Sequence, residues 1–477
     1  MGQEINATTY DRKDIKRFHN KLQTETKLLE RLIKEQKCSS AAPKAGFEIE
    51  AWLVDNDMRP VPCNSEFLDS INEPLAFPEL AKFNVELNSP PMPLAGNVFS
   101  HLLETLNATW EKSANHAESM NIHLLMIGTL PTLQQADLCL DNMSDMNRYR
   151  ALNEQILNSR GQPIHLDITG TEHLKFDHHD VMLESATTSL QIHTQIPLAI
   201  AHHYYNASII ASAAVVAISA NAPYLFGKNL WQESRIPLFE QAIETGGYDG
   251  AAHGPLKRVS FGSDYARHSM IECFKENLEH FPILLPEYFD SDPQQLAHLR
   301  LHNGTIWRWN RPLVGFDEDG TPHIRIEHRT PAAGPSTIDS IANAAFYYGL
   351  AKNLCDEIIS GQKIPLPFSQ AKDNFYQAAR HGLDSSTVWF DGNKHRLLDL
   401  IKSELLPRAI LGLKSLGVTT CDTEDFLQII EHRVNSKQTG SQWQIRFMNT
   451  HQCSFSEMTR QYWQNQCTGK PVSEWEI

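Results

Sequence analysis

Paired acidic residues on a short strand-like segment are the first feature of this 477-residue chain that could do chemistry. In segment 46–55, a period of two places Phe47 and Ile49 on one face and Glu48 and Glu50 on the other. The two carboxylates would lie roughly 7 Å apart on one strand face. An exposed strand edge is the better explanation of an isolated pair of this kind. Beneath a substrate the pair becomes a metal platform, because a cation offsets the repulsion between like charges.

Three further segments show the same alternation of apolar and polar residues. Their polar faces carry Asn84, Glu86 and Asn88 in 83–88, Gln191, His193 and Gln195 in 190–196, and Arg325, Glu327 and Arg329 in 323–329. If the four segments share one sheet, four acids, one imidazole and two guanidinium groups converge. Such a set suits Mg²⁺, a nucleotide and an acidic substrate. Taken alone, His193 would be a hydrogen-bonded core residue and Arg329 would pair with Glu327, so the hypothesis depends on the coincidence across strands.

Further cations and amides stand outside these segments. One predicted helix ends at the turn Asn221-Ala-Pro and another begins near Trp231, which could carry Asn221 and Arg235 to the mouth of the sheet. A solvated arginine in a helical connection is the alternative. Four more arginines occupy loop-like settings, for one or two of which triphosphate or carboxylate recognition is plausible: Arg258, Arg267, Arg308 and Arg311.

The elements that must position these residues mix short strands with longer helical patterns, which favours an α+β fold with an antiparallel sheet. Helices are predicted over 12–37, 98–121, 196–219, 231–245, 270–280, 337–360, 397–416, 423–436 and 454–466. We predict three parts: an N-terminal amphipathic helix and loop over 1–45, a catalytic domain over 46–365, and a helical C-terminal region over 366–477. No Pro/Ser-rich linker separates them, so one compact unit is expected.

Composition excludes several classes of protein. Apolar residues make up 41% of the chain, and 57 acidic against 42 basic residues give a net charge of −15, with no basic cluster for nucleic acid. The longest apolar stretch, 207–222, contains Ser and Asn and is shorter than the ~20 residues a bilayer requires. Eight dispersed cysteines without a Cys-x-x-Cys pair indicate reduced thiols and a cytoplasmic location. Neither a Walker loop, nor Gly-x-Gly-x-x-Gly, nor Gly-x-Ser-x-Gly is present, so any nucleotide needs metal ions and a different cradle.

The order of the motifs resembles the glutamate-cysteine ligase and carboxylate-amine ligase family over about residues 45–354. The motifs are Gly46-Phe-Glu-Ile-Glu, Glu86 before Ser-Pro-Pro, Gln191-Ile-His193, Ala220-Asn-Ala-Pro-Tyr-Leu-Phe-Gly with Arg235 downstream, and Ile326-Glu-His-Arg329. In addition, Trp307-Arg-Trp-Asn-Arg-Pro looks like the tryptophan-rich Arg-Pro motif of the bacterial carboxylate-amine ligase branch. The C-terminal helical region is similar to an extension found in a bacterial subgroup.

The resemblance implies a glutamine-synthetase-like fold, in which a curved antiparallel sheet forms an open funnel with helices outside. It also implies ATP and two or three Mg²⁺ ions, with Mn²⁺ as an alternative. The metal ligands or their neighbours would be Glu48, Glu50, Glu86, His193 and Glu327. Arg235 and Arg329 would face the acidic substrate or the transferred phosphate, and we assign Gln191, Arg258 and Arg311 to the nucleotide. Asn84 or Asn88 stands where some members place another acid, which leaves the number of metal sites open.

The expected activity is ATP-dependent ligation of the γ-carboxylate of L-glutamate to the amine of L-cysteine through an acyl phosphate. Two alternatives stay open: a ligase for another amine, and a nucleotide-binding regulatory protein without turnover. The expected partners are therefore small molecules, with neither nucleic acid nor a membrane among them. A homo-oligomer is compatible with the sequence.

Overall fold

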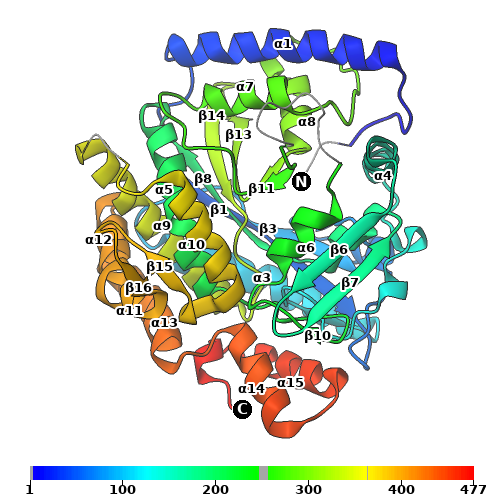
Figure 1. The fold of residues 1–477 in the computed structure, drawn as a ribbon, viewed down its shortest axis with the longest axis vertical. Helices are drawn as coiled ribbons and strands as arrows, with labels where there is room; N and C mark the ends of the chain where they lie inside the picture. The colour runs from blue at the N-terminus through cyan, green and yellow to red at the C-terminus, as the bar shows by residue number, and fades with distance from the viewer. Residues whose placement is uncertain (1–3, 246–255, 362–363) are drawn as a thin grey trace.

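One large, curved antiparallel sheet organises the computed structural model, which describes residues 4–245, 256–361 and 364–477 (Figure 1). Its strands run in the order β13 (Asn310–Phe316), β14 (Pro322–His328), β8 (Leu190–Ile196), β1 (Lys44–Val54), β3 (Asn84–Asn88) and β2 (Ala76–Pro78), and β4 (Met92–Pro93) and β5 (His123–Leu125) also pair with β1. The four segments predicted from alternation are thus the neighbours β14, β8, β1 and β3. The predicted α+β class with an antiparallel sheet is confirmed.

The strand register brings the polar positions into adjacent rows. Glu50 of β1 is opposite Glu86 of β3, and Glu48 is opposite Gln191 of β8. On the other side of β8, His193 is opposite Glu327 of β14. Because residues that face each other across a ladder project to the same side of the sheet, these side chains gather on one face.

The opposite face of the sheet is apolar and packs on helices. Phe47, Ile49 and Leu87 are buried there, against α3 (Val98–Ser119), α5 (Ala201–Ile218) and α9 (Thr337–Gly361). Helix α5 is buried on nearly all sides, and the hydroxyls of Ser208 and Ser212 donate to carbonyls one turn earlier. These internal hydrogen bonds let hydroxyl groups lie in the core.

The N-terminal helix α1 (Arg12–Lys34) lies along one edge of the molecule (Figure 1). A capping box formed by Asp11 and Asp14 begins the helix, and it packs on α7 (Ile271–His280) and α8 (Ala297–Gly304). Buried Glu25 accepts a hydrogen bond from the backbone nitrogen of Leu299 at 2.8 Å and lies 2.6 Å from Nδ1 of His298. Helix α1 therefore anchors α8, one of the elements that cover the polar face of the sheet.

Several predicted element boundaries were wrong. The predicted helix 196–219 begins only at Ala201, because β8 continues to Ile196 and Pro197 follows. The predicted helix 231–245 is the shorter α6 (Arg235–Ala242). The predicted helix 397–416 consists of α11 (Leu397–Leu400), a π-helical turn (Ile401–Leu405) and α12 (Leu406–Leu416).

Some elements were not predicted at all. The segment 307–312, expected as a loop, forms β12 (Trp307–Arg308), which pairs with β11 (Val259–Ser260), and the start of β13. The unpredicted helices are α2 (Asn64–Ile71), α4 (Asn147–Arg160), α8, α10 (Phe368–His381) and α14 (Gly440–His451). The unpredicted hairpins are β6 (Ile164–Thr169) with β7 (His173–His178), β9 (Tyr224–Leu225) with β10 (Lys228–Asn229), and β15 (Ser386–Val388) with β16 (Lys394–Arg396).

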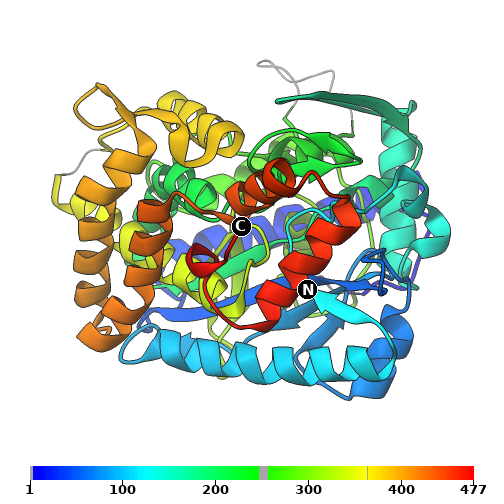
Figure 2. The same ribbon diagram turned by 90° about the horizontal axis from the view of Figure 1, so that it is seen from below.

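The C-terminal helices pack directly on the sheet-bearing part (Figure 2). Arg433 of α13 (Thr420–Ser436) pairs with buried Asp339 of α9 at 2.6 Å. On α15 (Phe455–Cys467), the hydroxyl of Tyr462 lies 2.8 Å from Nδ2 of Asn221. The helical character predicted for this region is confirmed, whereas the division at 45 and 365 stays a prediction. Within the described residues, no helix combines the length and apolarity needed to cross a membrane.

The contact between α9 and α12 generates a stability prediction. A Cβ on Gly412 of α12 would overlap the carbonyl oxygen of Gly349 of α9. We expect Gly412→Ala to lower the free energy of unfolding by about 1–3 kcal/mol, because the two backbones would have to separate. The control is Gly361→Ala on α9, where an added Cβ has no neighbour within 4 Å. Urea denaturation measures both variants, and equal midpoints for them would contradict this account of the interface.

Candidate active site

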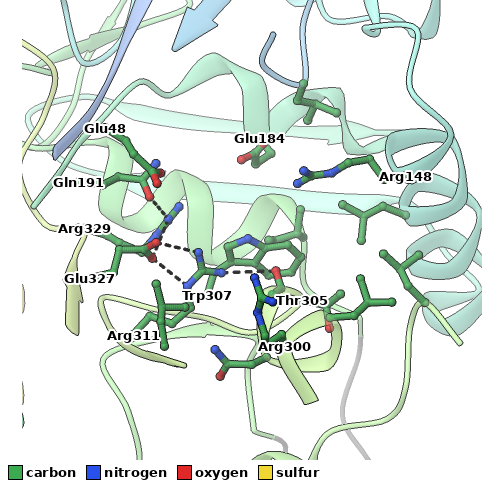
Figure 3. A pocket seen from close by; sticks show the side chains of 18 of the residues that line it. Glu48, Arg148, Glu184, Gln191, Arg300, Thr305, Trp307, Arg311, Glu327 and Arg329 are labelled. Atoms are coloured by element: carbon green, nitrogen blue, oxygen red, sulfur yellow. Dashed lines mark hydrogen bonds and ion pairs between the residues drawn. The ribbon is translucent and has the colours of Figure 1, made fainter. Parts of the chain in front are cut away.

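The polar face of the sheet forms one wall of an open cavity with an empty volume, mouth included, of about 1480 Å³ (Figure 3). Helices α4 and α8 and the short 3₁₀ helix η3 (Val181–Ala186) contribute to the other walls. The charged lining residues are Glu48, Glu50, Glu79, Glu86, Glu184, Glu327, Arg148, Arg300, Arg311, Arg325 and Arg329. A cavity lined by so many charged side chains suits polar, charged ligands.

The first acid group, called site 1 here, consists of Glu48, His193 and Glu327. Their ligand atoms lie within 4.8 Å of one another, and Nε2 of His193 is 3.1 Å from Glu48 and 4.0 Å from Glu327. Glu327 accepts hydrogen bonds from Arg311 at 2.8 and 2.9 Å and from Arg329 at 3.0 Å. These contacts fix the Glu327 carboxylate in one orientation on the sheet.

The charges around site 1 keep its carboxylates ionised. Burial acts to raise the pKa of Glu327, but Arg311 and Arg329 outweigh it and hold the pKa at about 2. Burial likewise opposes ionisation of Glu48, and His193 together with other nearby positive charges lowers its pKa well below the usual value. Site 1 therefore presents two negative carboxylates at neutral pH.

The second acid group, site 2, consists of Glu50, Glu79 and Glu86, whose oxygens also lie within 4.8 Å of one another. Glu50 accepts hydrogen bonds from the backbone nitrogen and hydroxyl of Ser189 at 2.7 and 3.0 Å, and from Gln191 at 3.1 Å. Glu327 of site 1 pairs with two arginines, whereas the hydrogen bonds to Glu50 come from uncharged donors.

Burial and mutual repulsion favour protons on site 2. Burial and then the charge of Glu86 raise the pKa of Glu50 to about 7, and burial followed by Glu50 and Glu184 raises that of Glu79 to about 7. Burial and the neighbouring Glu48 and Glu79 also raise the pKa of Glu86 well above its usual value. A divalent cation would replace these protons, so both sites fit Mg²⁺ or Mn²⁺ in donor type and spacing.

The structure brings most of the predicted site residues together. The five predicted metal ligands, together with Glu79, make up sites 1 and 2, with Arg311 and Arg329 beside them. Gln191 lies between the sites: its Nε2 donates to Glu50, and its Oε1 accepts a hydrogen bond from Arg329. Gln191 thus holds the orientation of both charged neighbours.

Arg235 and Arg258 lie elsewhere, and neither lines the cavity. The guanidinium of Arg258 is buried and donates to the carbonyl oxygens of Thr305 and Pro282. Arg235 is also buried, pairs with Glu233 at 3.0 Å, and donates to the backbone carbonyls of Thr330 and Arg329. Both side chains are engaged by other groups of the protein. Their positions do not support the direct contact with a ligand that was predicted from the sequence.

Four cavity residues were missed from the sequence. Glu79 follows β2, a strand of three residues that is too short to show alternation. In the structure Phe77 is opposite Glu86, so Glu79, two residues further on, lies on the polar face; this register is not evident from the sequence. Arg148, Glu184 and Arg300 come from α4, η3 and α8, outside the strand pattern altogether.

Comparisons with known proteins agree with this geometry. The family model described as glutamate-cysteine ligase family 2 (GCS2) matches residues 44–469. No curated protein sequence matches the chain significantly. A glutamate–cysteine ligase from Francisella tularensis, solved in complex with AMP, superposes with a TM-score of 0.55 at 12% identity, over 91% of this chain and 90% of that one.

A bifunctional glutathione synthetase from Pasteurella multocida gives a TM-score of 0.51 at 11% identity, over 89% of this chain and 52% of the other. The present chain thus spans about half the length of that protein. At these identities the structural likeness concerns the fold, and it confirms the predicted glutamine-synthetase-like arrangement.

The pKa shifts in site 2 lead to a prediction about stability and pH. The pKa of Glu79 rises from 4.5 to about 7 on folding, so the folded chain binds the extra proton and loses stability as pH rises through this range. In metal-free protein, Glu79→Gln should therefore raise the melting temperature at pH 8 by about 2 °C or more. At pH 5 the gain should be small.

Added Mg²⁺ should stabilise the wild-type protein at pH 8 and should stabilise Glu79→Gln much less. The matched control is Glu279→Gln, whose side chain is 63% exposed on α7. Thermal melts with and without a chelator provide the measurement. This account would be contradicted if Glu79→Gln melted below the wild type at pH 8 and responded normally to Mg²⁺. Repulsion among the carboxylates of site 2 would then not destabilise the metal-free protein.

Proposed function

Since the chain belongs to glutamate-cysteine ligase family 2, we propose that its cavity joins the γ-carboxylate of L-glutamate to the amine of L-cysteine at the expense of ATP. Family membership by itself supports a carboxylate-amine ligase. The observation that carries the proposal is the position of two acid groups on one sheet face, beside Arg311 and Arg329. This arrangement combines cation binding with anion recognition, which phosphoryl transfer to a carboxylate requires.

ATP is needed because a carboxylate is a poor electrophile. In the proposed first step, the γ-carboxylate oxygen forms a bond to the γ-phosphorus of ATP, and ADP leaves, which gives an acyl phosphate. In the second step, the amine attacks the acyl carbon, phosphate leaves and the amine loses a proton. No covalent enzyme intermediate is required, in agreement with the absence of a nucleophile motif.

The residues of the chain mainly position and neutralise charge. Sites 1 and 2 would hold Mg²⁺, which, when bound, shields the phosphate oxygens. Arg311 and Arg329 present guanidinium groups to the same region, and their hydrogen bonds to Glu327 restrict their motion. Gln191, fixed between Glu50 and Arg329, completes this wall. We assign Gln191 and Arg311 to the nucleotide phosphates and Arg329 to the reacting carboxylate or phosphate.

Nucleotide binding has further support from the Francisella ligase, whose structure holds AMP. We place the reaction in the cytoplasm, since all eight cysteines are unpaired thiols, as expected in a reducing compartment. The identity of the amine is the least constrained part of the proposal. A panel of amines is therefore included in its test.

The direct test is ADP and phosphate release from ATP, Mg²⁺ and glutamate, with cysteine or each of a panel of other amines. Cysteine should give the highest kcat/KM. A higher value with another amine would change the substrate but keep the reaction. Absence of amine-dependent ADP release with every amine tested would reject the ligase proposal and favour a nucleotide-binding regulatory protein.

We further expect Glu48→Gln and Glu327→Gln each to lower kcat by about 10³-fold or more, because each removes a carboxylate that would hold the cation shielding the transferred phosphate. Both variants should stay folded in the presence of chelator, although Glu327→Gln should melt below the wild type, because it removes the carboxylate that pairs with Arg311 and Arg329. Glu318→Gln, an exposed acid in the turn between β13 and β14, is the control. If both variants kept wild-type rates, the acids of site 1 would be merely structural.

A further inference from the structure

Two oppositely charged side chains enter the cavity from outside the sheet. Arg148 comes from α4 and Glu184 from η3, and Figure 3 shows them close together, across the cavity from Glu327, Arg311 and Arg329. Neither belongs to the acid groups of sites 1 and 2. Neither residue has a role in the phosphoryl transfer proposed above.

Glu184 needs a positive partner. Its carboxylate makes no hydrogen bond or ion pair within the part of the chain that the structure describes; only its backbone carbonyl is engaged, by Thr187. Burial and the charge of Glu50 raise the pKa of Glu184 to about 7. A half-buried carboxylate in this position is stabilised by a ligand that brings an ammonium group.

Arg148 supplies the complementary charge at the same wall. Its guanidinium packs over the ring of Tyr149, 4.9 Å from the centroid, and its backbone nitrogen donates to Glu4 at 3.0 Å. The charge of Arg148 acts on both Glu79 and Glu184. A planar guanidinium group that is directed into a cavity can donate two parallel hydrogen bonds to a carboxylate.

A side chain that binds anions next to one that binds cations matches the α-carboxylate and α-ammonium groups of an amino acid. We propose that Arg148 binds the α-carboxylate and Glu184 the α-ammonium group of the glutamate that donates the acyl group; this inference rests on the proposed ligase function. The γ-carboxylate then extends across the cavity toward Arg329, Arg311 and site 1. Arg148 and Glu184 thus select an α-amino acid as the acyl donor.

The chemistry assigns this head group to the acyl donor rather than to the attacking amine. The nucleophile must lose a proton and reach the acyl phosphate on the sheet side of the cavity. An amino group held by Glu184 would be an ammonium ion, directed away from that wall. The α-ammonium group of glutamate takes no part in the reaction, so it can stay bound throughout the cycle.

Two glutamate analogues isolate the two contacts. Glutarate lacks the α-amino group and 4-aminobutyrate lacks the α-carboxylate, while both keep the reacting carboxylate. In the wild type, both should have a much lower kcat/KM than glutamate. Glu184→Gln should lower kcat/KM for glutamate about 10–100-fold, mainly through KM, and change the value for glutarate little. It should therefore lose the preference for glutamate over glutarate and keep the preference over 4-aminobutyrate.

Arg148→Met should show the reverse pattern, with the preference over 4-aminobutyrate lost and the preference over glutarate kept. The KM for ATP and the Mg²⁺ dependence should be unchanged in both variants. Arg150→Met and Glu154→Gln, at exposed positions of the same helix α4, are the matched controls. Melting temperatures verify that all four variants are folded.

A uniform loss with all three donors, or no loss at all, would overturn the inference. A shifted Mg²⁺ requirement in Glu184→Gln would also overturn it, because Glu184 would then be a metal ligand. If the wild type releases no ADP with glutamate, the proposed function fails separately. Calorimetry still tests the pair in that case, since Arg148 and Glu184 predict tighter binding of glutamate than of glutarate and 4-aminobutyrate.

Discussion

Electrostatic repulsion among carboxylates on one face of a sheet is the constraint on which the rest of the structure depends. The register of β1, β3, β8 and β14 brings four acids, Glu48, Glu50, Glu86 and Glu327, to one face of the sheet, where Glu79 and His193 join them. Site 1 is neutralised in part by Arg311 and Arg329, whereas burial and mutual repulsion in site 2 raise the pKa values of its carboxyl groups and favour protons there. Such an arrangement is stable at neutral pH when cations occupy it.

The remainder of the fold makes this arrangement rigid. The apolar face of the sheet packs on α5 and α9, and the C-terminal helices lock onto α9 through the buried pair Arg433 and Asp339. Helix α1 anchors α8 through Glu25, and α8 in turn lines the cavity. An active site that works by positioning its substrates needs such support, because small displacements of the charged side chains lower the reaction rate.

The sequence allowed prediction of the sheet face because a period of two is a strong and local signal. Glu48, Glu50, Glu86, His193 and Glu327 lie on strands long enough to show it, and all five meet in the structure. Residues from helices and very short strands gave no such signal, so Glu79, Arg148 and Glu184 were missed. Arg235 was assigned from its position in a motif and Arg258 from its loop-like setting. Neither signal reveals that the Arg235 side chain pairs with Glu233 or that the Arg258 side chain donates to backbone carbonyl oxygens.

The most direct test of the central claim is the stoichiometry of Mn²⁺ binding, measured by electron paramagnetic resonance with and without ATP. Two ligand groups on adjacent strands predict at least two Mn²⁺ ions per chain, close enough for their spins to couple, and loss of the coupled signal in Glu86→Gln. Binding of no Mn²⁺, or an identical spectrum in the wild type and Glu86→Gln, would contradict the claim that the acidic face of the sheet is a cation site.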